Sequence, residues 1–206
     1  MPTRPRSRRC NSAAWRRTSP GRAAARRTNY FTAMPSGKLQ PPEKSAMQQP
    51  HLHSLTTSEE SETEALGAAL AALLPRPAVI ALHGDLAAGK TALVRGLARA
   101  LGFEGAVNSP TFTLINQYGD APPLYHLDLY RLDSLDELAE LGIEDLFDQG
   151  LCAIEWAERA GRLLPEQRIE IRLEHAGADL RSIEIENRGL LADGWQDALS
   201  FDRITG

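Results

Sequence analysis

The chain has little cysteine and no long apolar run, and each shortage excludes a class of protein. Its 206 residues include only Cys10 and Cys152, too few for a disulfide framework, and this fits a reducing compartment. No run reaches the roughly 18 apolar residues of a membrane span, so we expect a cytoplasmic protein without a membrane partner. A hydrophobic fraction of 42% and a net charge of -4 are typical of a globular chain and exclude collagen-like or wholly disordered proteins.

Acidic residues are missing from the first part of the chain. Residues 1–42 hold nine Arg, one Lys and no Asp or Glu, a charge of +10, whereas residues 43–206 carry a charge of -14. Residues 35–50 are rich in Pro, Gln and Ser, which is typical of a linker. We therefore expect a basic, disordered extension and linker at 1–50, followed by one folded domain at 51–206.

Three interpretations of the basic extension remain open. Its arginines could bind nucleic acid. It could be a transit peptide, because it is Arg-rich and acid-free. It could also be an upstream extension that the working protein does not need, with Met34 or Met47 as a later start. A secretory signal is excluded, because no apolar segment of adequate length follows the charges.

The domain alternates between helical and strand patterns. A capping-box pattern at Thr57 predicts a helix to Leu74, and helices are also expected at 91–101 and 134–141. Short apolar runs predict strands at 78–82, 111–115, 124–129 and 151–154. Residues 169–173 and 183–186 alternate with period two and predict a half-exposed hairpin at one edge. Together these predict an α/β, P-loop NTPase-like three-layer fold with a mostly parallel sheet and an antiparallel edge hairpin.

A glycine-bounded segment after the strand at 78–82 has the spacing of a phosphate-binding loop. The pattern G-x-x-x-x-G-K-[ST] is met in full by Gly84, Asp85, Leu86, Ala87, Ala88, Gly89, Lys90 and Thr91. Glycines let backbone N–H groups approach a phosphate, and the start of the next helix adds partial positive charge. Lys90 would reach the β- and γ-phosphates, and Thr91 would offer its hydroxyl to Mg²⁺. Lys90 is also the only lysine after residue 44, and a compact ammonium suits a phosphate cradle.

Two acids stand at the ends of predicted strands. Asp128 and Glu155 follow short apolar runs, and the carboxyl ends of parallel strands line the ligand crevice of an open α/β sheet. Nucleotide hydrolysis needs a carboxylate for Mg²⁺ and a positioned water, so we expect both acids to face the phosphates. Thr111 follows Ser109 and Pro110 in a loop that could reach the γ-phosphate and the metal shell. The alternative is that the acids are solvated residues and the loop an ordinary turn.

These motifs together resemble the TsaE (YjeE) family, the P-loop ATPase subunit of the bacterial machinery that makes N6-threonylcarbamoyladenosine at position 37 of certain tRNAs. The similar segments are the phosphate-binding loop, Asn-Ser-Pro-Thr-Phe-Thr-Leu at 108–114, His-Leu-Asp-Leu-Tyr-Arg-Leu at 126–132 and Ile-Glu-Trp at 154–156. The resemblance covers roughly residues 55–186. Where the family commonly has Gly and Thr, this chain has Ala87 and Ala92. The replacement of Gly by Ala87 matters only if the backbone at this position needs a positive φ.

The resemblance implies a small ATPase that uses ATP and Mg²⁺, binds a TsaB–TsaD heterodimer and keeps that complex turning over. It implies weak hydrolysis by the chain alone, stimulation by the partners, and contact with tRNA only through the complex. Each site residue also receives a role from the resemblance: Lys90, Thr91 and Ala92 at the phosphates, Thr91 and Glu155 at Mg²⁺, Asp128 at the metal or the attacking water, Thr111 as a sensor-like threonine, and Glu60 and Thr63 near the base or ribose.

Two other functions remain open from the residues alone. A small-molecule kinase on the same scaffold would need an acceptor pocket and an arginine-bearing lid, and no lid-like insertion is visible. A nucleotide-dependent switch without useful turnover would share the same loop. Among the remaining residues, we expect His83 and His126 to be satisfied core histidines and Cys152 to be an inert core thiol. Trp156 could pack on the sheet or lie near a partner surface.

Overall fold

The computed structural model describes residues 51–132, 134–177 and 179–200. The predicted extension lies outside these residues, so the division of the chain at residue 50 stays a prediction. None of the helices in the described ranges has the length and apolar character that a membrane span requires.

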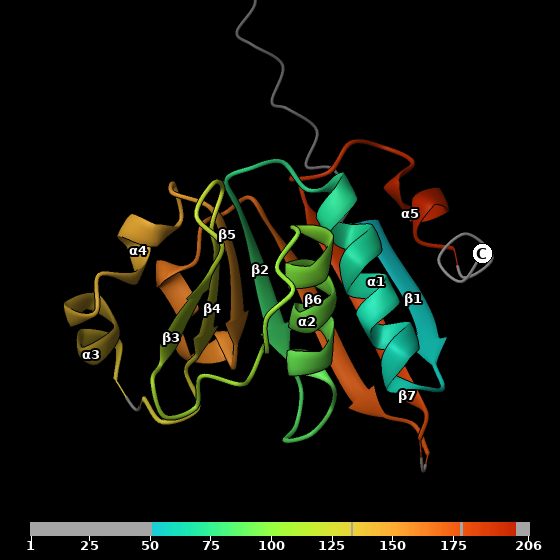
Figure 1. Ribbon diagram of the computed structural model, residues 1–206, viewed down its shortest axis with the longest axis horizontal. Coiled ribbons are helices and arrows are strands. Elements are labelled where there is room, and N and C mark those ends of the chain that lie inside the picture. The colour runs from blue at the N-terminus through green and yellow to red at the C-terminus, as the bar shows by residue number, and fades with distance from the viewer. Residues whose placement is uncertain (1–50, 133, 178, 201–206) are drawn as a thin grey trace, which may run out of the picture. The chain divides into compact units, whose positions relative to one another are not determined.

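The described residues contain a seven-stranded sheet with the order β1-β7-β6-β2-β5-β4-β3 (Figure 1). Its strands are β1 (His51–Thr57), β2 (Ala78–His83), β3 (Ile115–Tyr118), β4 (Leu124–Asp128), β5 (Leu151–Glu155), β6 (Arg168–His175) and β7 (Arg181–Arg188). The four central strands, β6, β2, β5 and β4, pair in parallel. The pairings β1–β7, β6–β7 and β3–β4 are antiparallel.

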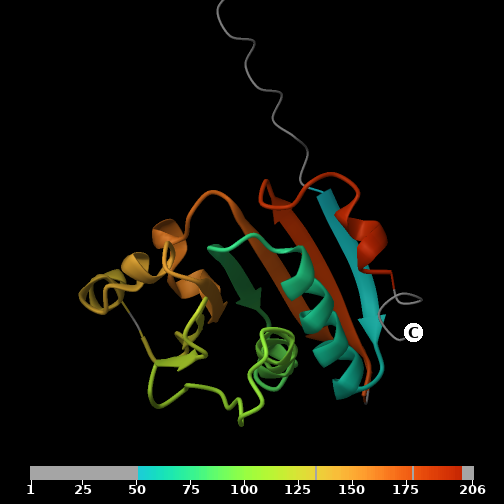
Figure 2. The same ribbon diagram turned by 45° about the horizontal axis from the view of Figure 1, so that its top comes forward.

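Helices cover both faces of this sheet. They are α1 (Glu60–Leu73), α2 (Lys90–Ala100), α3 (Leu135–Glu140), α4 (Ile143–Leu146) and α5 (Trp195–Ala198), with a 3-10 turn, η1, at Ala157–Arg159. Figure 2 shows α1 and α2 side by side against one face, where they share a core with Ile80 and Leu82 of β2. Val79 and Ala81 point to the other face, into a core shared with α3, α4 and η1. The predicted α/β three-layer fold is confirmed.

The first helix begins later than its sequence predicts. Thr57 is the last residue of β1, a strand that the sequence did not predict, and α1 begins at Glu60. The capping box is present but shifted, because Glu59 and Glu62 exchange hydrogen bonds with the backbone at the helix start. Thr57 is buried instead, with its hydroxyl 3.0 Å from that of Thr63. The predicted hairpin is present as β6 and β7, but β1 continues the sheet beyond it and forms the outer edge.

The prediction of a strand at 111–115 is wrong except for its last residue. Residues 111–113 form a turn, and β3 begins at Ile115. The Leu114 N–H donates to the Pro110 carbonyl at 2.6 Å, and Leu114 has a φ of 64°, so the chain reverses before it can enter the sheet. The helix predicted from Ser134 is confirmed as α3, and the Ser134 hydroxyl caps it by accepting a hydrogen bond from the Glu137 N–H. The short helices α4 and α5 were not predicted.

Candidate nucleotide-binding site

The glycine-rich loop joins the central strand β2 to the start of α2. Gly89 precedes the helix with a φ of 110°, and Gly84 opens the loop with a φ of 128°. A Cβ at Gly84 would lie 2.0 Å from the Leu173 carbonyl oxygen of β6, so only glycine fits this approach. Leu93 and Leu97 are fully buried and fix α2 against the sheet. Strand, loop and helix therefore have the arrangement that holds a phosphate at a helix start.

Lys90 is the buried cation of this loop, with 4% of its surface exposed. Its Nζ donates hydrogen bonds to the carbonyls of Gly84 at 2.6 Å and Asp85 at 2.7 Å. The same atom lies 4.3 Å from the ring centroid of Trp156. Burial lowers the pKa of the Lys90 ammonium, and the nearby carboxylates of Glu155 and Asp128 offset part of that effect. The ammonium is thus held at the loop, next to the two predicted acids.

The two predicted acids lie side by side. Asp128 ends β4 and Glu155 ends β5, and the two residues are paired in register in the parallel sheet. Both are buried. The Thr91 hydroxyl donates to Glu155 Oε1 at 2.8 Å, which links the start of α2 to the end of β5. The structure therefore brings together three of the residues on which the sequence argument depended.

The loop at 109–111 holds Asp128 in place. The hydroxyls of Ser109 and Thr111 donate to Asp128 Oδ2 at 2.8 Å and 2.5 Å, and the Tyr130 N–H donates to Oδ1 at 3.0 Å. Three donors on one carboxylate fix its orientation. The loop is therefore part of the site, and not an ordinary connection between elements.

A buried histidine holds Glu155. His126 is fully buried in β4, and its Nε2 lies 2.9 Å from Glu155 Oε1. Its Nδ1 has no hydrogen-bond partner within the part of the chain that the structure describes. His126 is a core histidine, as predicted, but one of its ring nitrogens is not satisfied within the described residues and the other orients a site carboxylate. His83, at the end of β2, lies between the carboxylates of Glu158 and Glu170. Cys152 is buried, and burial raises the pKa of its thiol to about 12.

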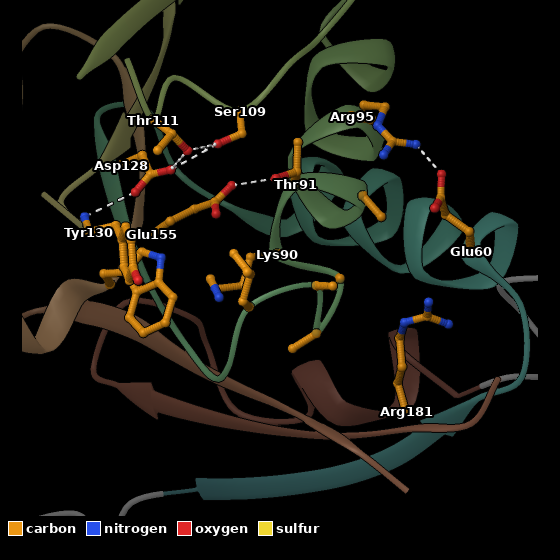
Figure 3. Close-up of a pocket in the computed structure, with 16 residues that line it drawn as sticks. Glu60, Lys90, Thr91, Arg95, Ser109, Thr111, Asp128, Tyr130, Glu155 and Arg181 are labelled. Carbon is orange, nitrogen blue, oxygen red and sulfur yellow. Dashed lines mark hydrogen bonds and ion pairs between the residues drawn. The ribbon is translucent and has the colours of Figure 1, made fainter. Parts of the chain in front are cut away.

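The phosphate-binding loop, the two acids and Thr111 line a cavity of about 490 Å³ (Figure 3). It is lined by the predicted residues Glu60, Leu86, Ala87, Ala88, Gly89, Lys90, Thr91, Ala92, Thr111, Asp128 and Glu155. Gly84 and Asp85 are not among the lining residues, but their carbonyls hold Lys90. Thr63 is not brought into the cavity, because it is fully buried against Thr57. The cavity is also lined by Arg95, Ser109, Tyr130, Trp156 and Arg181, which the predicted set of site residues did not include.

Two of these additional residues are arginines at the same end of the cavity as Glu60. Arg95 lies one helical turn after Thr91 on α2, so the helical spacing was a signal that could have found it. It contacts Glu60 and donates to Glu64 at 2.8 Å. The hydrogen bond from Arg95 lowers the pKa of Glu60. Arg181 comes from β7, and no local sequence pattern connects it with the loop.

The oxygen atoms at the end of the cavity away from Glu60 fit a hard divalent cation. The Thr91 hydroxyl and the carboxylates of Asp128 and Glu155 offer oxygen atoms, which Mg²⁺ prefers. In the described ranges, no group of three or more His, Cys, Asp or Glu could hold a metal. Mg²⁺ commonly takes one or two carboxylates and completes its shell with phosphate oxygens and water, so two acids and a hydroxyl suffice.

The strand–loop–helix unit with its buried lysine, and the acids at the ends of adjacent parallel strands, define a P-loop nucleotide-binding protein. Comparison with known proteins narrows this class. The family model described as "Threonylcarbamoyl adenosine biosynthesis protein TsaE" matches residues 57–183, and the chain belongs to the TsaE family. The family resemblance predicted from the sequence is confirmed.

Relatives and a solved structure agree with this assignment. A TsaE protein of Bacillus subtilis is 43% identical over 129 residues, which cover 62% of this chain and 80% of the relative. A TsaE protein of Treponema pallidum is 40% identical over 125 residues, covering 60% of this chain and 93% of that protein. The crystal structure of Bacillus subtilis YdiB has a TM-score of 0.60 and 35% identity, and the match covers 74% of this chain and 96% of YdiB.

Proposed function

We propose that this protein binds and hydrolyses ATP with Mg²⁺ in the cavity at the start of α2. Its role is in the biosynthesis of tRNA threonylcarbamoyladenosine, for which its TsaE relatives are named. The observation that carries the proposal is the contact of Thr91 with Glu155, at 2.8 Å, beside the buried Lys90. This contact puts the hydroxyl and the carboxylate that would hold Mg²⁺ directly against the loop that would hold the phosphates.

Each residue has a separate task in this proposal. The backbone N–H groups at the start of α2 and the Lys90 ammonium hold the phosphate chain and offset its charge. Thr91 and Glu155 would hold Mg²⁺, which supplies charge neutralisation at the transferring phosphoryl group when it is bound. Asp128 is kept in one orientation by three donors, so its carboxylate is suited to orient the attacking water or a metal-bound water. His126 keeps Glu155 turned toward Thr91.

The proposed stimulation by a TsaB–TsaD-type complex is supported by the surroundings of the cavity. Phe112 is 87% exposed and follows Thr111, while Tyr130 is 45% exposed and bonds to Asp128 through its N–H. The Tyr130 ring packs against that of Trp156, with centroids 4.9 Å apart, and Trp156 in turn contacts Lys90. A protein that binds these exposed aromatic side chains would therefore touch residues that hold the site. Contact with tRNA would occur through that complex, and the cytoplasmic location stays a prediction.

The test is ATP binding and hydrolysis by the Lys90→Ala and Lys90→Arg variants. We expect slow hydrolysis by the unchanged protein, a higher rate with the partner complex, and a loss of about a hundredfold or more in Lys90→Ala. Lys90→Arg should be as inactive as Lys90→Ala, because a planar guanidinium does not fit the space of a compact ammonium. Thermal unfolding checks that the variants are folded. Hydrolysis by folded Lys90→Ala at the unchanged rate would refute the assignment of the site.

A further inference from the structure

His83 lies at the end of β2, directly before Gly84 of the phosphate-binding loop. Its ring lies between two carboxylates that come from different elements. Nδ1 lies 3.2 Å from Glu158 Oε2 of η1, and Nε2 contacts Glu170 Oε2 of β6. Only 15% of the His83 side chain is exposed. The histidine therefore connects two other elements to the start of the loop that would hold the phosphates.

Both contacts can form together only when the ring is charged. An ionised carboxylate accepts hydrogen bonds and donates none, and a neutral imidazole has only one N–H group. Burial opposes the ionisation of Glu170, but hydrogen bonds from His83 and Arg168 outweigh burial and lower its pKa to about 2. Glu170 is therefore an acceptor at any pH near neutrality. Two carboxylates need two ring donors, which only the imidazolium form supplies.

The charged groups around His83 hold Glu170 more firmly than Glu158. Arg168 donates to Glu170 Oε1 at 2.6 Å, and Arg188 Nε lies 3.5 Å from the same atom. The side chain of Glu158 is 51% exposed, so water can replace the imidazole as its partner. The hollow of about 250 Å³ beside the ring is also lined by Leu52, Arg172, Glu184, Glu186 and Arg188. When the ring loses its second proton, Glu158 is thus the partner that is released.

Both segments that His83 joins reach the buried Lys90. On one side, the Gly84 carbonyl accepts a hydrogen bond from Lys90 Nζ. On the other side, η1 directly follows Trp156, whose ring centroid lies 4.3 Å from Lys90 Nζ. The charge of Glu158 also acts on Lys90: burial lowers the pKa of the ammonium, and Glu158 is one of the carboxylates that oppose this effect. A release of Glu158 would therefore change the surroundings of the cation that would hold the phosphates.

We infer, on the basis of the proposed ATP site, that His83 in its charged form is a positioning residue that joins η1 to the phosphate-binding loop and makes ATP binding sensitive to pH. The contact with Glu158 is present while both ring nitrogens carry a proton, and it is lost as the pH rises through the titration of the ring. Without it, η1 and Trp156 are less restrained beside Lys90. Part of the binding free energy must then restore their order, so ATP binds more weakly.

The experiment measures the Kd of ATP for the unchanged full chain, His83→Gln, His83→Arg and the control His53→Gln. The measurements extend from about pH 5.5 to about pH 8.5, on both sides of the titration of an ordinary imidazole. Each Kd is divided by that of the unchanged chain at the same pH, which cancels the titration of ATP and of all shared residues. His53 lies in β1 and does not line the cavity, so His53→Gln should give a ratio of one throughout.

The two variants of His83 should differ from the unchanged chain at opposite ends of this range. Glutamine is neutral and can serve only one of the two carboxylates, so His83→Gln should raise the Kd by about twofold to fivefold at low pH, as the loss of a partly exposed ion pair does. At high pH the unchanged chain has lost the same contact, and the ratio should approach one. Arginine keeps its charge and several donors, so His83→Arg should bind ATP more tightly than the unchanged chain at high pH.

A cycle of single and double variants tests whether Glu158 is the partner through which His83 acts. At low pH, Glu158→Ala should raise the Kd as much as His83→Gln does, and the combined variant should raise it no further. Glu184→Ala is the matched control, because Glu184 is an exposed glutamate of β7 that lines the same hollow. It should leave the Kd unchanged. Thermal unfolding checks that every variant is folded.

A His83→Gln ratio that is the same at every pH would overturn the inference, because it would show at most a role in packing. Additive effects of His83→Gln and Glu158→Ala would overturn it too, as would a His83→Arg ratio of one at high pH. If the unchanged chain binds no ATP, and Lys90→Ala makes no difference, the proposed function fails. The same cycle, measured by urea denaturation without nucleotide, then still decides whether His83 and Glu158 act together. If ATP binds but the ratios do not vary with pH, the inference alone fails.

Discussion

Ala87 occupies a backbone conformation that suits glycine better than alanine. Its φ is 62°, within the left-handed region, and its side chain is exposed in the phosphate-binding loop. This conformation costs an L-residue about 1–2 kcal/mol, whereas a glycine loses about 0.5–1 kcal/mol through the greater freedom of its unfolded chain. We therefore expect Ala87→Gly to raise the free energy of unfolding by about 0.5–1 kcal/mol. Urea denaturation measures the change.

Ala88 is the matched control for this prediction. It neighbours Ala87, is fully buried, and is not among the described residues with a positive φ. Ala88→Gly removes a buried methyl group and adds unfolded-state freedom, so the free energy of unfolding should fall by about 1 kcal/mol. A lower stability of Ala87→Gly would show that the strain is absent or offset by another contact.

The site residues that could be predicted are those whose position follows from a strand or a helix end. Lys90 and Thr91 begin α2, and Asp128 and Glu155 end parallel strands, so the α/β pattern alone brings these four together. Arg181 could not be found in this way, because its place depends on the pairing of β7 with β1 and β6. Thr63 was placed near the nucleotide by resemblance alone. One turn of helix separates Thr63 from the cavity, and its hydroxyl bonds to that of Thr57 instead.

At the scale of elements, the site depends on an unusually close contact between α1 and α2. A Cβ at Gly96 would lie 1.8 Å from the Glu64 carbonyl oxygen, and one at Gly67 would lie 2.1 Å from that of Leu93. Alanine would stabilise an isolated helix by about 1 kcal/mol over glycine. In this contact it must push the helices apart, so we expect Gly96→Ala to lower the free energy of unfolding by about 2 kcal/mol or more. Chemical denaturation gives the sign and the size.

The same variant should also weaken ATP binding, because α1 carries Glu60 and α2 begins at Lys90. Ala72→Gly is the control, since Ala72 is exposed on α1. It should cost only about 1 kcal/mol of helix propensity and leave the Kd of ATP unchanged. If Gly96→Ala is as stable as the unchanged protein, or more so, helix propensity prevails and the close contact does not govern the packing.

Elements were predictable where local sequence and burial agree. β2, β4 and β5 are short apolar runs that the sheet buries on both faces, and all three were predicted. β1 was not predicted, because His51–Thr57 has few apolar residues and becomes a strand through its pairing with β7. Residues 111–113 have the composition of a strand, but the Thr111 hydroxyl donates to Asp128, and the turn at Leu114 excludes these residues from the ladder. A pairing distant in sequence decides the first case, and a local turn together with the distant contact to Asp128 decides the second.

At the scale of the whole molecule, charge limits how the protein meets RNA. Residues 43–206 carry a charge of -14, which repels phosphates over a distance of about 10 Å at 0.1 M salt. Two cations of the cavity do little to offset this charge, since Lys90 is buried and Arg95 is paired with two carboxylates. A chain beginning at Met47 should therefore bind free tRNA no more tightly than about 100 μM at moderate salt, the weak limit of non-specific binding.

Comparing tRNA binding by the full chain with tRNA binding by the shortened chain tests the role of the ten basic residues in 1–42. If they bind nucleic acid, the full chain should bind tRNA more tightly than the shortened one, and the logarithm of its affinity should fall steeply with the logarithm of the salt concentration. If they serve targeting or nothing at all, the curves for the two chains measured by filter binding should agree at every salt concentration. ATP binding by the shortened chain checks that it is folded. Tight, salt-sensitive binding by the shortened chain would contradict the charge argument, because a net charge of -14 repels the phosphates of tRNA.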